Sequence, residues 1–496
     1  MHNSKFTAKN SNFPQVLMVS LVFFLPFMIN NLPYNDDYYK SLWGQSHFIE
    51  DGRPFAELVI RFFSFFSHTI NNISPLTWII SSILLGSSCY FVCKRTHGNK
   101  SFILFFASLL IFISPNYIDN SMYRYDVLTM SLSLSVAIIS ATVLINNTRS
   151  LFIVLFGNFV YFCTYQLSVS AFVIISMLFF VVNISNDKDR KLYLLDLLLK
   201  AVSLIASYLV YNAAKPLMHI SKYAREMGDM ENISDMPGHL YGSALGYINR
   251  ILGLYDTPSI LAIAIAFSLS FVYVFIICLK IIKTKDVFII KLFSCLALIL
   301  IMPCSLFFIF APIAMLKKQP DTLRMIIGLG SFIYLCISLS WYLLKDYKVL
   351  KHTSTAITII LLVYTLSVTY AVNNAYKAQY ILSNGISLNV LSSIGTADAG
   401  DIKEINYTVT GGPLAYETER VRNDHPFTKQ ILKDGFTALP HWAGYTYQSS
   451  IKVGEWFSKS QTSDACGGFS IVKGVNYDIY RKDDIIYVDL TKSKCK

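Results

Sequence analysis

Apolar residues fill most of the chain in blocks of about 20 residues, separated by short polar stretches, and a helix needs about 20 apolar residues to cross a bilayer core of about 30 Å. Such blocks predict membrane-spanning helices at residues 13–32, 75–93, 101–118, 127–145, 192–214, 259–279, 292–314, 325–344 and 354–373. The run 151–183 is too long for one span, and the polar group Thr164, Tyr165 and Gln166 interrupts it. We therefore expect a hairpin of two short helices there, which makes about eleven spans in all.

Lysine and arginine residues collect in one set of the connections between these blocks, and such residues favour the cytoplasmic side of a membrane. They are Lys94, Arg95, Lys100, Arg149, Lys188, Arg190, Lys191, Lys280, Lys283, Lys285, Lys345, Lys348 and Lys351. With a cytoplasmic N-terminus, all of them fall inside only if 151–183 crosses twice, and the C-terminus is then outside. The first block follows Lys5 and Lys9 as in a signal peptide, but no small-residue cleavage site follows it, so we expect an uncleaved helix.

Four segments face the outside in this topology, namely residues 33–74, 115–126, 215–258 and 315–324. Within the first of them, residues 55–66 are too short to span a membrane. They predict a helix lying along the membrane surface, with Glu57 and Arg61 one turn apart.

Composition supports a membrane protein, because only 15% of the residues are charged and 54% belong to the AVILMFWYC set, whereas a soluble domain carries about 25% charged residues. A soluble enzyme, a disordered protein and a disulfide-dense secreted module are therefore excluded. Residues 374–496 contain no spanning run, and short segments such as 405–409 and 485–490 predict strands. The predicted fold is an all-α polytopic membrane domain of residues 1–373 followed by a small α+β extracytoplasmic domain of residues 374–496. In that tail Cys466 and Cys495 could pair if the outside is oxidising.

Acidic residues avoid the centres of the predicted spans, where a charge costs about 2.5–3.5 kcal/mol, and gather at the outer ends. The densest group, Asp36 and Asp37 beside Tyr38, Tyr39 and Trp43, follows the first span. The other outer loops add Arg53, Arg124, Asp126, Lys317, Lys318 and Arg324. Carboxylates suit general-base work on a hydroxyl, and arginine and lysine suit a phosphate. Together they suggest transfer from a phosphorylated lipid to a hydroxylated acceptor, although interfacial anchors and lipid head-group contacts are alternative interpretations.

A family resemblance supports this prediction of a transferase. The segment Asn35-Asp-Asp-Tyr-Tyr-Lys-Ser-Leu-Trp-Gly44, followed by Asp51-Gly-Arg-Pro54, resembles the opening signature of bacterial O-antigen glucosyl transferases of the serotype-converting type. Tyr123-Arg-Tyr-Asp126, Thr164-Tyr-Gln166 and His425-Pro-Phe-Thr-Lys-Gln-Ile431 leading to Trp442 are also similar to that family. The resemblance covers the order of elements over most of the chain, and Lys40 stands where the pattern leads us to expect arginine.

The resemblance implies a GT-C type architecture in the bacterial inner membrane, with the site on the periplasmic face. It implies a donor of undecaprenyl phosphate carrying glucose and an acceptor sugar of the lipid-linked O-antigen repeat, a lipopolysaccharide modification that changes serotype. A companion flippase and a donor-synthesising transferase are implied partners, beside membrane lipids. An Asp in the first outer loop then acts as the base, and that role falls on Asp36 or Asp37.

The remaining site residues receive roles as hypotheses. Lys317, Lys318 and Arg324, with Arg53 or Arg124, would offset the charge that develops on the departing phosphate. Asp126 would orient the acceptor or help the base, Tyr38, Tyr39 and Trp43 would stack on sugar faces, and Gln166 joins the substrate-binding set through its motif.

Other functions stay open at this point. A polysaccharide polymerase or flippase of the inner membrane would share the many spans and the formal net charge of +11. Ionisable residues at one face disfavour a transporter, which places them at mid-membrane depth. The chain has no Gly-rich phosphate loop, no zinc pattern and no feature that predicts a nucleic-acid partner, so no cofactor is expected, and a divalent ion between carboxylate and phosphate is left open.

Overall fold

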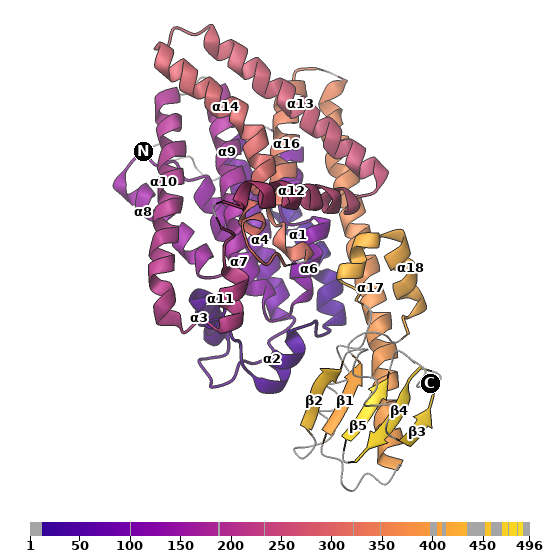
Figure 1. The fold of residues 1–496 in the computed structure, drawn as a ribbon. Helices are drawn as coiled ribbons and strands as arrows, with labels where there is room; N and C mark the ends of the chain where they lie inside the picture. The colour runs from indigo at the N-terminus through magenta and orange to yellow at the C-terminus, as the bar shows by residue number, and fades with distance from the viewer. Residues whose placement is uncertain are drawn as a thin grey trace. The chain divides into compact units, whose positions relative to one another are not determined.

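The computed structural model describes residues 12–496 except for residues 100, 187–188, 233, 321, 348, 397–403, 409–412, 434–451, 458–468, 475, 484 and 490–496. The chain divides into two compact units (Figure 1). The first unit comprises residues up to Ile29 together with Ser46–Thr369, and the second comprises Asn30–Gln45 together with Tyr370–Lys496. Trp442, Cys466 and Cys495 lie outside the described residues, and so does the side chain of Tyr39.

The described residues are largely helical, as the apolar blocks predict. Seven helical segments are long and apolar enough to cross a membrane: α1 (Phe13–Asn30), α4 (Leu76–His97), Gln166–Ser185 with α9 (Val169–Ser185), Arg190–Met218 with α10 (Arg190–Ala214), α13 (Thr257–Ile282), α14 (Phe288–Phe308) and Thr353–Ile394 within α17 (Thr353–Thr396). Three shorter apolar helices accompany them, α7 (Val127–Ala141), α8 (Thr148–Phe162) and α16 (Gly328–Leu344). A multi-pass membrane protein is therefore supported, while its orientation stays a prediction.

The expected hairpin at 151–183 is present as two separate helices. α8 ends at Phe162, and α9 starts at Val169 after the 3-10 turn Gln166–Ser168. The carbonyl of Cys163 at this break accepts the N–H of Phe55 at 3.0 Å and of Ala56 at 3.3 Å. The first turn of α3 (Pro54–Phe63), which is the expected surface helix with its Glu57–Arg61 ion pair, is thus held at the break.

The single continuous helix predicted for the span at 101–118 is wrong, because two short helices replace it. α5 (Phe102–Leu109) and α6 (Pro115–Met122) are separated by a turn. Ser114 is extended, with φ −143° and ψ 148°, a conformation that the residue before a proline favours over the helical one. The turn packs against α16 at Gly330, where a Cβ atom would lie 2.3 Å from the carbonyl oxygens of Leu110 and Ile111.

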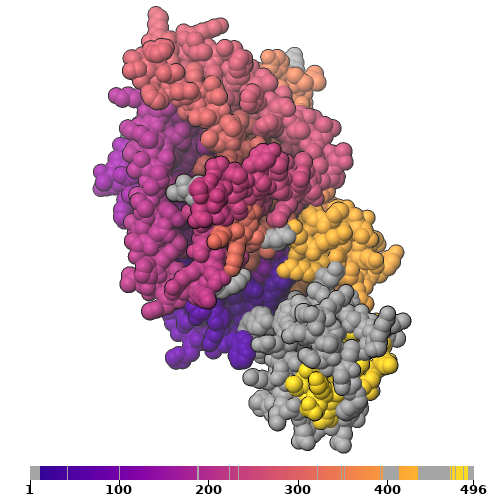
Figure 2. All heavy atoms as spheres, in the orientation of Figure 1, coloured from indigo at the N-terminus to yellow at the C-terminus, as the bar shows by residue number. Residues whose placement is uncertain are grey.

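Within the first unit, α4, α7, α8, α9, α10, α13 and α16 pack against one another in neighbouring pairs. α12 (Met236–Gly253) runs across one face of this helical group, at a steep angle to α9 and α10 (Figures 1 and 2). Tyr247 of α12 stacks on Phe310, with ring centroids 5.8 Å apart. Two short helices complete this part, α11 (Lys222–Gly228) and α15 (Ala311–Ala314).

The second unit contains α2 (Asp37–Trp43), the C-terminal part of α17, α18 (Tyr416–Asp424) and a five-stranded sheet of order β2-β1-β5-β4-β3. The strands are β1 (Glu404–Thr408), β2 (Lys452–Phe457), β3 (Phe469–Lys473), β4 (Asp478–Lys482) and β5 (Ile485–Asp489). β1 pairs in parallel with β2 and β5, whereas β4 pairs antiparallel with β3 and β5. The two strands expected from the sequence are therefore confirmed as β1 and β5.

Reporter fusions test the double crossing. We expect fusions after residue 147 and after residue 188 to report the same, cytoplasmic side, because α8 and α9 lie between these points and each is apolar. A fusion at the C-terminus should report the outside. A cytoplasmic signal after residue 147 with an outside signal after residue 188 would contradict the hairpin. Every later loop would then lie on the side of the membrane opposite to the predicted one.

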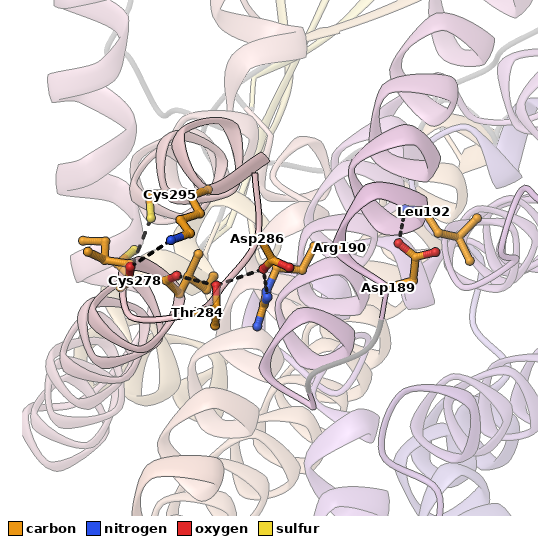
Figure 3. A network of polar contacts seen from close by, with 10 residues as sticks. Asp189, Arg190, Leu192, Cys278, Thr284, Asp286 and Cys295 are labelled. Carbon is orange, nitrogen blue, oxygen red and sulfur yellow. Dashed lines mark hydrogen bonds and ion pairs between the residues drawn. The ribbon is translucent and has the colours of Figure 1, made fainter. Parts of the chain in front are cut away.

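A polar network joins the predicted inner ends of α10, α13 and α14 (Figure 3). Arg190 at the start of α10 forms an ion pair with Asp286, and the Thr284 hydroxyl donates to the same carboxylate oxygen at 2.9 Å. The hydrogen bond from Thr284, together with the Arg190 guanidinium, lowers the pKa of Asp286. The network ties the α13–α14 connection to the start of α10.

Replacing Asp286 by Asn should lower the free energy of unfolding by no more than about 1 kcal/mol, because the ion pair is partly exposed. A carboxylate with a lowered pKa in the folded protein stabilises it above the unfolded value of about 3.9. The difference from wild type should be full at pH 7 and fade as the pH falls below about 4. Thermal unfolding in detergent, at pH 7 and below about pH 4, measures this difference in stability between Asp286→Asn and the wild type. Asp346→Asn, on an exposed loop residue, is the matched control, and an equal effect there would contradict the assignment.

Candidate functional site

Four segments of the first unit meet around Tyr165, which lies in the break between α8 and α9. We call Arg53, Asp119, Tyr123, Tyr165 and Arg324 the arginine–tyrosine cluster. Tyr165 is almost fully buried, and its hydroxyl donates to the carbonyl oxygen of Arg324 at 3.0 Å. Burial raises the pKa of Tyr165 to about 12, and the positive charges of Arg324 and Arg53 oppose part of that rise. The phenol therefore stays protonated at neutral pH and serves as a donor.

Arg53 enters the cluster from the residue before α3. Its guanidinium carbon lies 5.5 Å from the centroid of the Tyr165 ring. Its Nε is buried and makes no hydrogen bond to any part of the chain that the structure describes. The carbonyl of Gly52, one residue earlier, accepts from the Tyr211 hydroxyl at 2.9 Å and from Gln166 at 3.5 Å. Arg53 is thus placed by neighbours on both sides and keeps donor capacity for a ligand.

Arg324 enters from the 3-10 turn Leu323–Met325. Its backbone N–H donates to Oδ2 of Asp119 at 3.2 Å, and its guanidinium carbon lies 4.7 Å from the Tyr123 ring centroid. The nearby amide of Asn116, which is fully buried, donates to the carbonyl of Ile326 at 3.0 Å. α6 therefore fixes the backbone of this turn and leaves the arginine side chain over an aromatic face.

The other predicted residues of the first unit lie beside this cluster in different ways. Asp126 is buried at the start of α7, and its negative charge acts on Tyr165. Arg124 lies over the ring of Tyr125, at 5.4 Å from its centroid. Gln166 donates to the Tyr211 hydroxyl at 3.0 Å, so it supports the Gly52 backbone in addition to any substrate role.

Lys317 and Lys318 belong to a separate group of contacts. Lys318 is exposed and forms an ion pair with Glu226 at 2.8 Å. The backbone N–H of Lys317 donates to the carbonyl of Asp229 at 2.8 Å. The three cations lie within eight positions of one another, yet the Lys318 side chain pairs with Glu226 and the Arg324 side chain lies over Tyr123. The structure instead brings together two of the predicted outer segments, 215–258 and 315–324.

The paired aspartates lie in the second unit, at the start of α2. Asp36 is exposed, and its side chain makes no capping hydrogen bond to the helix. Asp37 has an exposed fraction of 0%, and its Oδ2 accepts the N–H of Tyr34 at 3.0 Å. The two carboxylates, adjacent in sequence, thus have opposite environments. Tyr38 and Lys40 are buried, whereas Trp43 is 63% exposed.

Two segments that resemble the family motifs meet inside the second unit. The Tyr34 hydroxyl donates to the carbonyl of Ile431 at 3.5 Å, and the Tyr34 ring packs edge-on against Tyr376, with centroids 5.6 Å apart. A cavity of about 40 Å³ lies between α2, α17 and residues 431–433. That volume holds water molecules and not a sugar, so these contacts support the position of α2.

Three residues of the cluster were absent from the predicted site set. Tyr123 and Tyr165 stand inside the quoted motifs, and Asp119 lies four positions before the first of them. Nearness to a motif was the sequence signal that could have found them, whereas the convergence of the four segments depends on helix packing. No group of three or more His, Cys, Asp or Glu side chains that could hold a metal ion occurs in the described part of the chain.

Comparison with known proteins identifies relatives. A sequence profile described as Glucosyl transferase GtrII matches residues 25–335, a range that includes every candidate residue named above. A Salmonella phage P22 protein named "Uncharacterized 55.3 kDa protein in gtrB 5'region" is 23% identical over 433 residues, covering 86% of this chain and 88% of that protein. No solved structure matches the chain.

Proposed function

This chain belongs to the glucosyl transferase GtrII family, and from that premise we propose that it moves glucose from undecaprenyl phosphate to a sugar of the lipid-linked O-antigen repeat. Membership implies glycosyltransferase activity. The donor, the acceptor, action at the periplasmic face of the inner membrane and the change of serotype are parts of the proposal. So are a GT-C architecture and cooperation with a flippase and a donor-synthesising transferase.

The observation that carries the proposal is the convergence of Arg53 and Arg324 on Tyr165. The Arg53 guanidinium lies at the Tyr165 ring and the Arg324 guanidinium lies over the neighbouring Tyr123 ring, and the positive charges of both act on Tyr165. Such a pair suits an anionic oxygen, because each guanidinium offers several N–H donors in a planar fork. The turns that supply these residues adjoin apolar helices, as the phosphate of a membrane-embedded donor requires. A soluble nucleotide sugar would need no such placement.

The reaction is an inverting displacement at the anomeric carbon of glucose. A carboxylate takes the proton from the acceptor hydroxyl, and that oxygen forms the new glycosidic bond. The bond between the anomeric carbon and the phosphate oxygen breaks, and undecaprenyl phosphate leaves with the electron pair. Arg53 and Arg324 stabilise the charge that grows on the leaving phosphate.

Asp36 fits the base better than Asp37. An exposed carboxylate without a capping bond reaches a substrate hydroxyl, whereas Asp37 is buried and holds the Tyr34 backbone. Asp37 is then a positioning residue for α2. Tyr38 and Lys40 are buried, and among the described aromatic side chains of α2 the exposed Trp43 offers a face for a sugar.

Mass spectrometry of O-antigen from cells with and without this protein tests the proposal. We expect a gain of one hexose per repeat unit. An unchanged repeat mass with a changed distribution of chain lengths would contradict it and favour a polymerase. Loss of O-antigen from the cell surface without a change in repeat mass would favour a flippase.

A further inference from the structure

A second site lies in the first unit, where residues 345–352 connect α16 to α17. A cavity of about 610 Å³ is bounded there by α5, α16 and the first turns of α17. Its volume falls within the range of about 300–1,000 Å³ that small-molecule pockets occupy. None of the residues proposed for glucosyl transfer lines it.

The lining changes from polar to apolar along the helices. Ser101, Lys345 and His352 stand at helix ends, just before α5, just after α16 and just before α17. Phe106 lies about 6 Å into α5, and Leu362 lies about 15 Å along α17 from His352, at 1.5 Å per residue. The cavity therefore has a polar mouth and an apolar interior, which matches a molecule with a polar head and a hydrocarbon chain.

The mouth is positively charged. Lys345 is exposed, and its Nζ lies over the rings of Trp341 and Tyr342, at 5.9 Å and 5.3 Å from their centroids. Among the described residues no carboxylate forms an ion pair with Lys345 or His352. The same connection also carries Lys348 and Lys351 against the single Asp346. An anionic head group is therefore the complementary ligand.

We propose that this cavity binds an anionic glycerophospholipid of the leaflet that residues 345–352 face, which is the cytoplasmic leaflet in the predicted topology. Its phosphate lies at Lys345 and His352, and one acyl chain follows Phe106, Ile359 and Leu362. Trp341 lies at the boundary between head and chain, where tryptophan is enriched in membrane proteins. This site is independent of the proposed glucosyl transfer.

Bulk leaflet lipid suits this cavity better than a phosphorylated polyprenol does. The lysine-rich mouth lies at the predicted inner ends of the helices, whereas the arginine–tyrosine cluster lies at their predicted outer ends. A second copy of this chain would have to present an acidic group next to an apolar surface, while anionic phospholipid supplies both from the surrounding membrane.

Quenching of Trp341 fluorescence tests the site. The purified full-length protein is titrated in neutral detergent with phosphatidylglycerol brominated on one acyl chain, and in parallel with the matching phosphatidylcholine. We expect saturable quenching by the anionic lipid, absent from Trp341→Phe. Lys345→Ala should raise the half-quenching concentration about five-fold, since one surface lysine contributes about that factor. Lys283→Ala, an exposed lysine on another predicted inner loop, should leave it unchanged.

Several results would overturn the proposal. Equal quenching by both lipids, or equal effects of Lys345→Ala and Lys283→Ala, would show that no head group is recognised. Ile359→Trp reduces the cavity volume and should abolish saturable quenching by the lipid in a folded protein. Saturable quenching in this variant would rule out the proposed path of the acyl chain. Displacement of phosphatidylglycerol by lower concentrations of a polyprenyl phosphate would assign the cavity to that lipid instead. Crosslinking of two copies through Trp341 would assign it to an oligomer interface.

Discussion

Asp36→Asn is expected to lower the rate of hexose transfer by about 10²–10⁴-fold, the usual contribution of a general base. Asn keeps the size of the side chain but cannot accept the proton of the acceptor hydroxyl. Because Asp36 is exposed and makes no helix-capping bond, the variant should unfold at the same temperature as the wild type. The measurement is hexose transfer to lipid-linked O-antigen in membranes, with protein amounts matched by immunoblot.

Asp37→Asn is the internal control for this prediction. The buried Asp37 carboxylate accepts the N–H of Tyr34. Asn replaces one acceptor oxygen by an NH2 donor and removes the charge, and a hydrogen bond to a charged group contributes about 1.5–3 kcal/mol. Its defect should therefore appear in thermal stability as well as in activity. If Asp37→Asn loses activity at full stability while Asp36→Asn stays active, the two roles are exchanged. If both variants keep more than about a tenth of the activity, the loss is smaller than the about 10²-fold minimum expected for a lost base. Neither residue is then the base, and Asp126 becomes the next candidate.

Arg324→Ala is expected to lower kcat by about 10²–10³-fold, the usual effect of removing one preorganised contact to a developing negative charge. The fold should persist, because Arg324 holds Asp119 and Tyr165 through its backbone N–H and carbonyl, which alanine retains. Arg324→Lys keeps the charge but loses the planar fork, so its kcat should lie between those of the wild type and Arg324→Ala. Initial rates at varied donor concentration separate kcat from KM.

Lys318→Ala is the matched control for Arg324. Lys318 is 59% exposed and paired with Glu226, and exposed ion pairs contribute about 0–1 kcal/mol. Its rate should stay within a few-fold of wild type. A loss as large as that of Arg324→Ala would instead put the donor phosphate at residues 315–319. A rise in KM without a fall in kcat would mean that Arg324 binds the ground state and transition state equally.

The sequence predicted most of the apolar helices, because apolar length and local breakers act within a few residues. Of the about eleven spans expected, seven described segments are long enough to cross a membrane, and three further apolar helices are shorter. It located the break at 163–168 from three polar residues, and it located the strands of the tail from their β-branched residues. It failed at 101–118, where hydrophobicity alone favoured one continuous helix and Ser114, before Pro115, is extended. The backbone preference of the residue before proline prevails at this position, whereas α1 and α14 continue through Pro26 and Pro303.

The site was predictable in its residue types but not in its groupings. Lys318 and Arg324 are close in sequence, yet their contacts go to Glu226 and to Tyr123. Tyr165 and Arg324 are 159 positions apart, and a hydrogen bond joins them. The opposite burial of Asp36 and Asp37 likewise follows from the turn at Tyr34, since no property of an Asp-Asp pair distinguishes its members. Contacts of this kind depend on tertiary packing.

Three helices of the first unit are short, and the arginine–tyrosine cluster lies next to their ends. α7 has 15 residues and starts after Asp126, α8 has 15 and ends just before Tyr165, and α16 has 17 and begins just after Arg324. Fifteen residues span about 22 Å, about 8 Å less than a hydrocarbon core of about 30 Å. This hydrophobic mismatch favours local thinning of the bilayer. A lipid phosphate that meets these arginines therefore lies deeper than the phosphates of the surrounding leaflet.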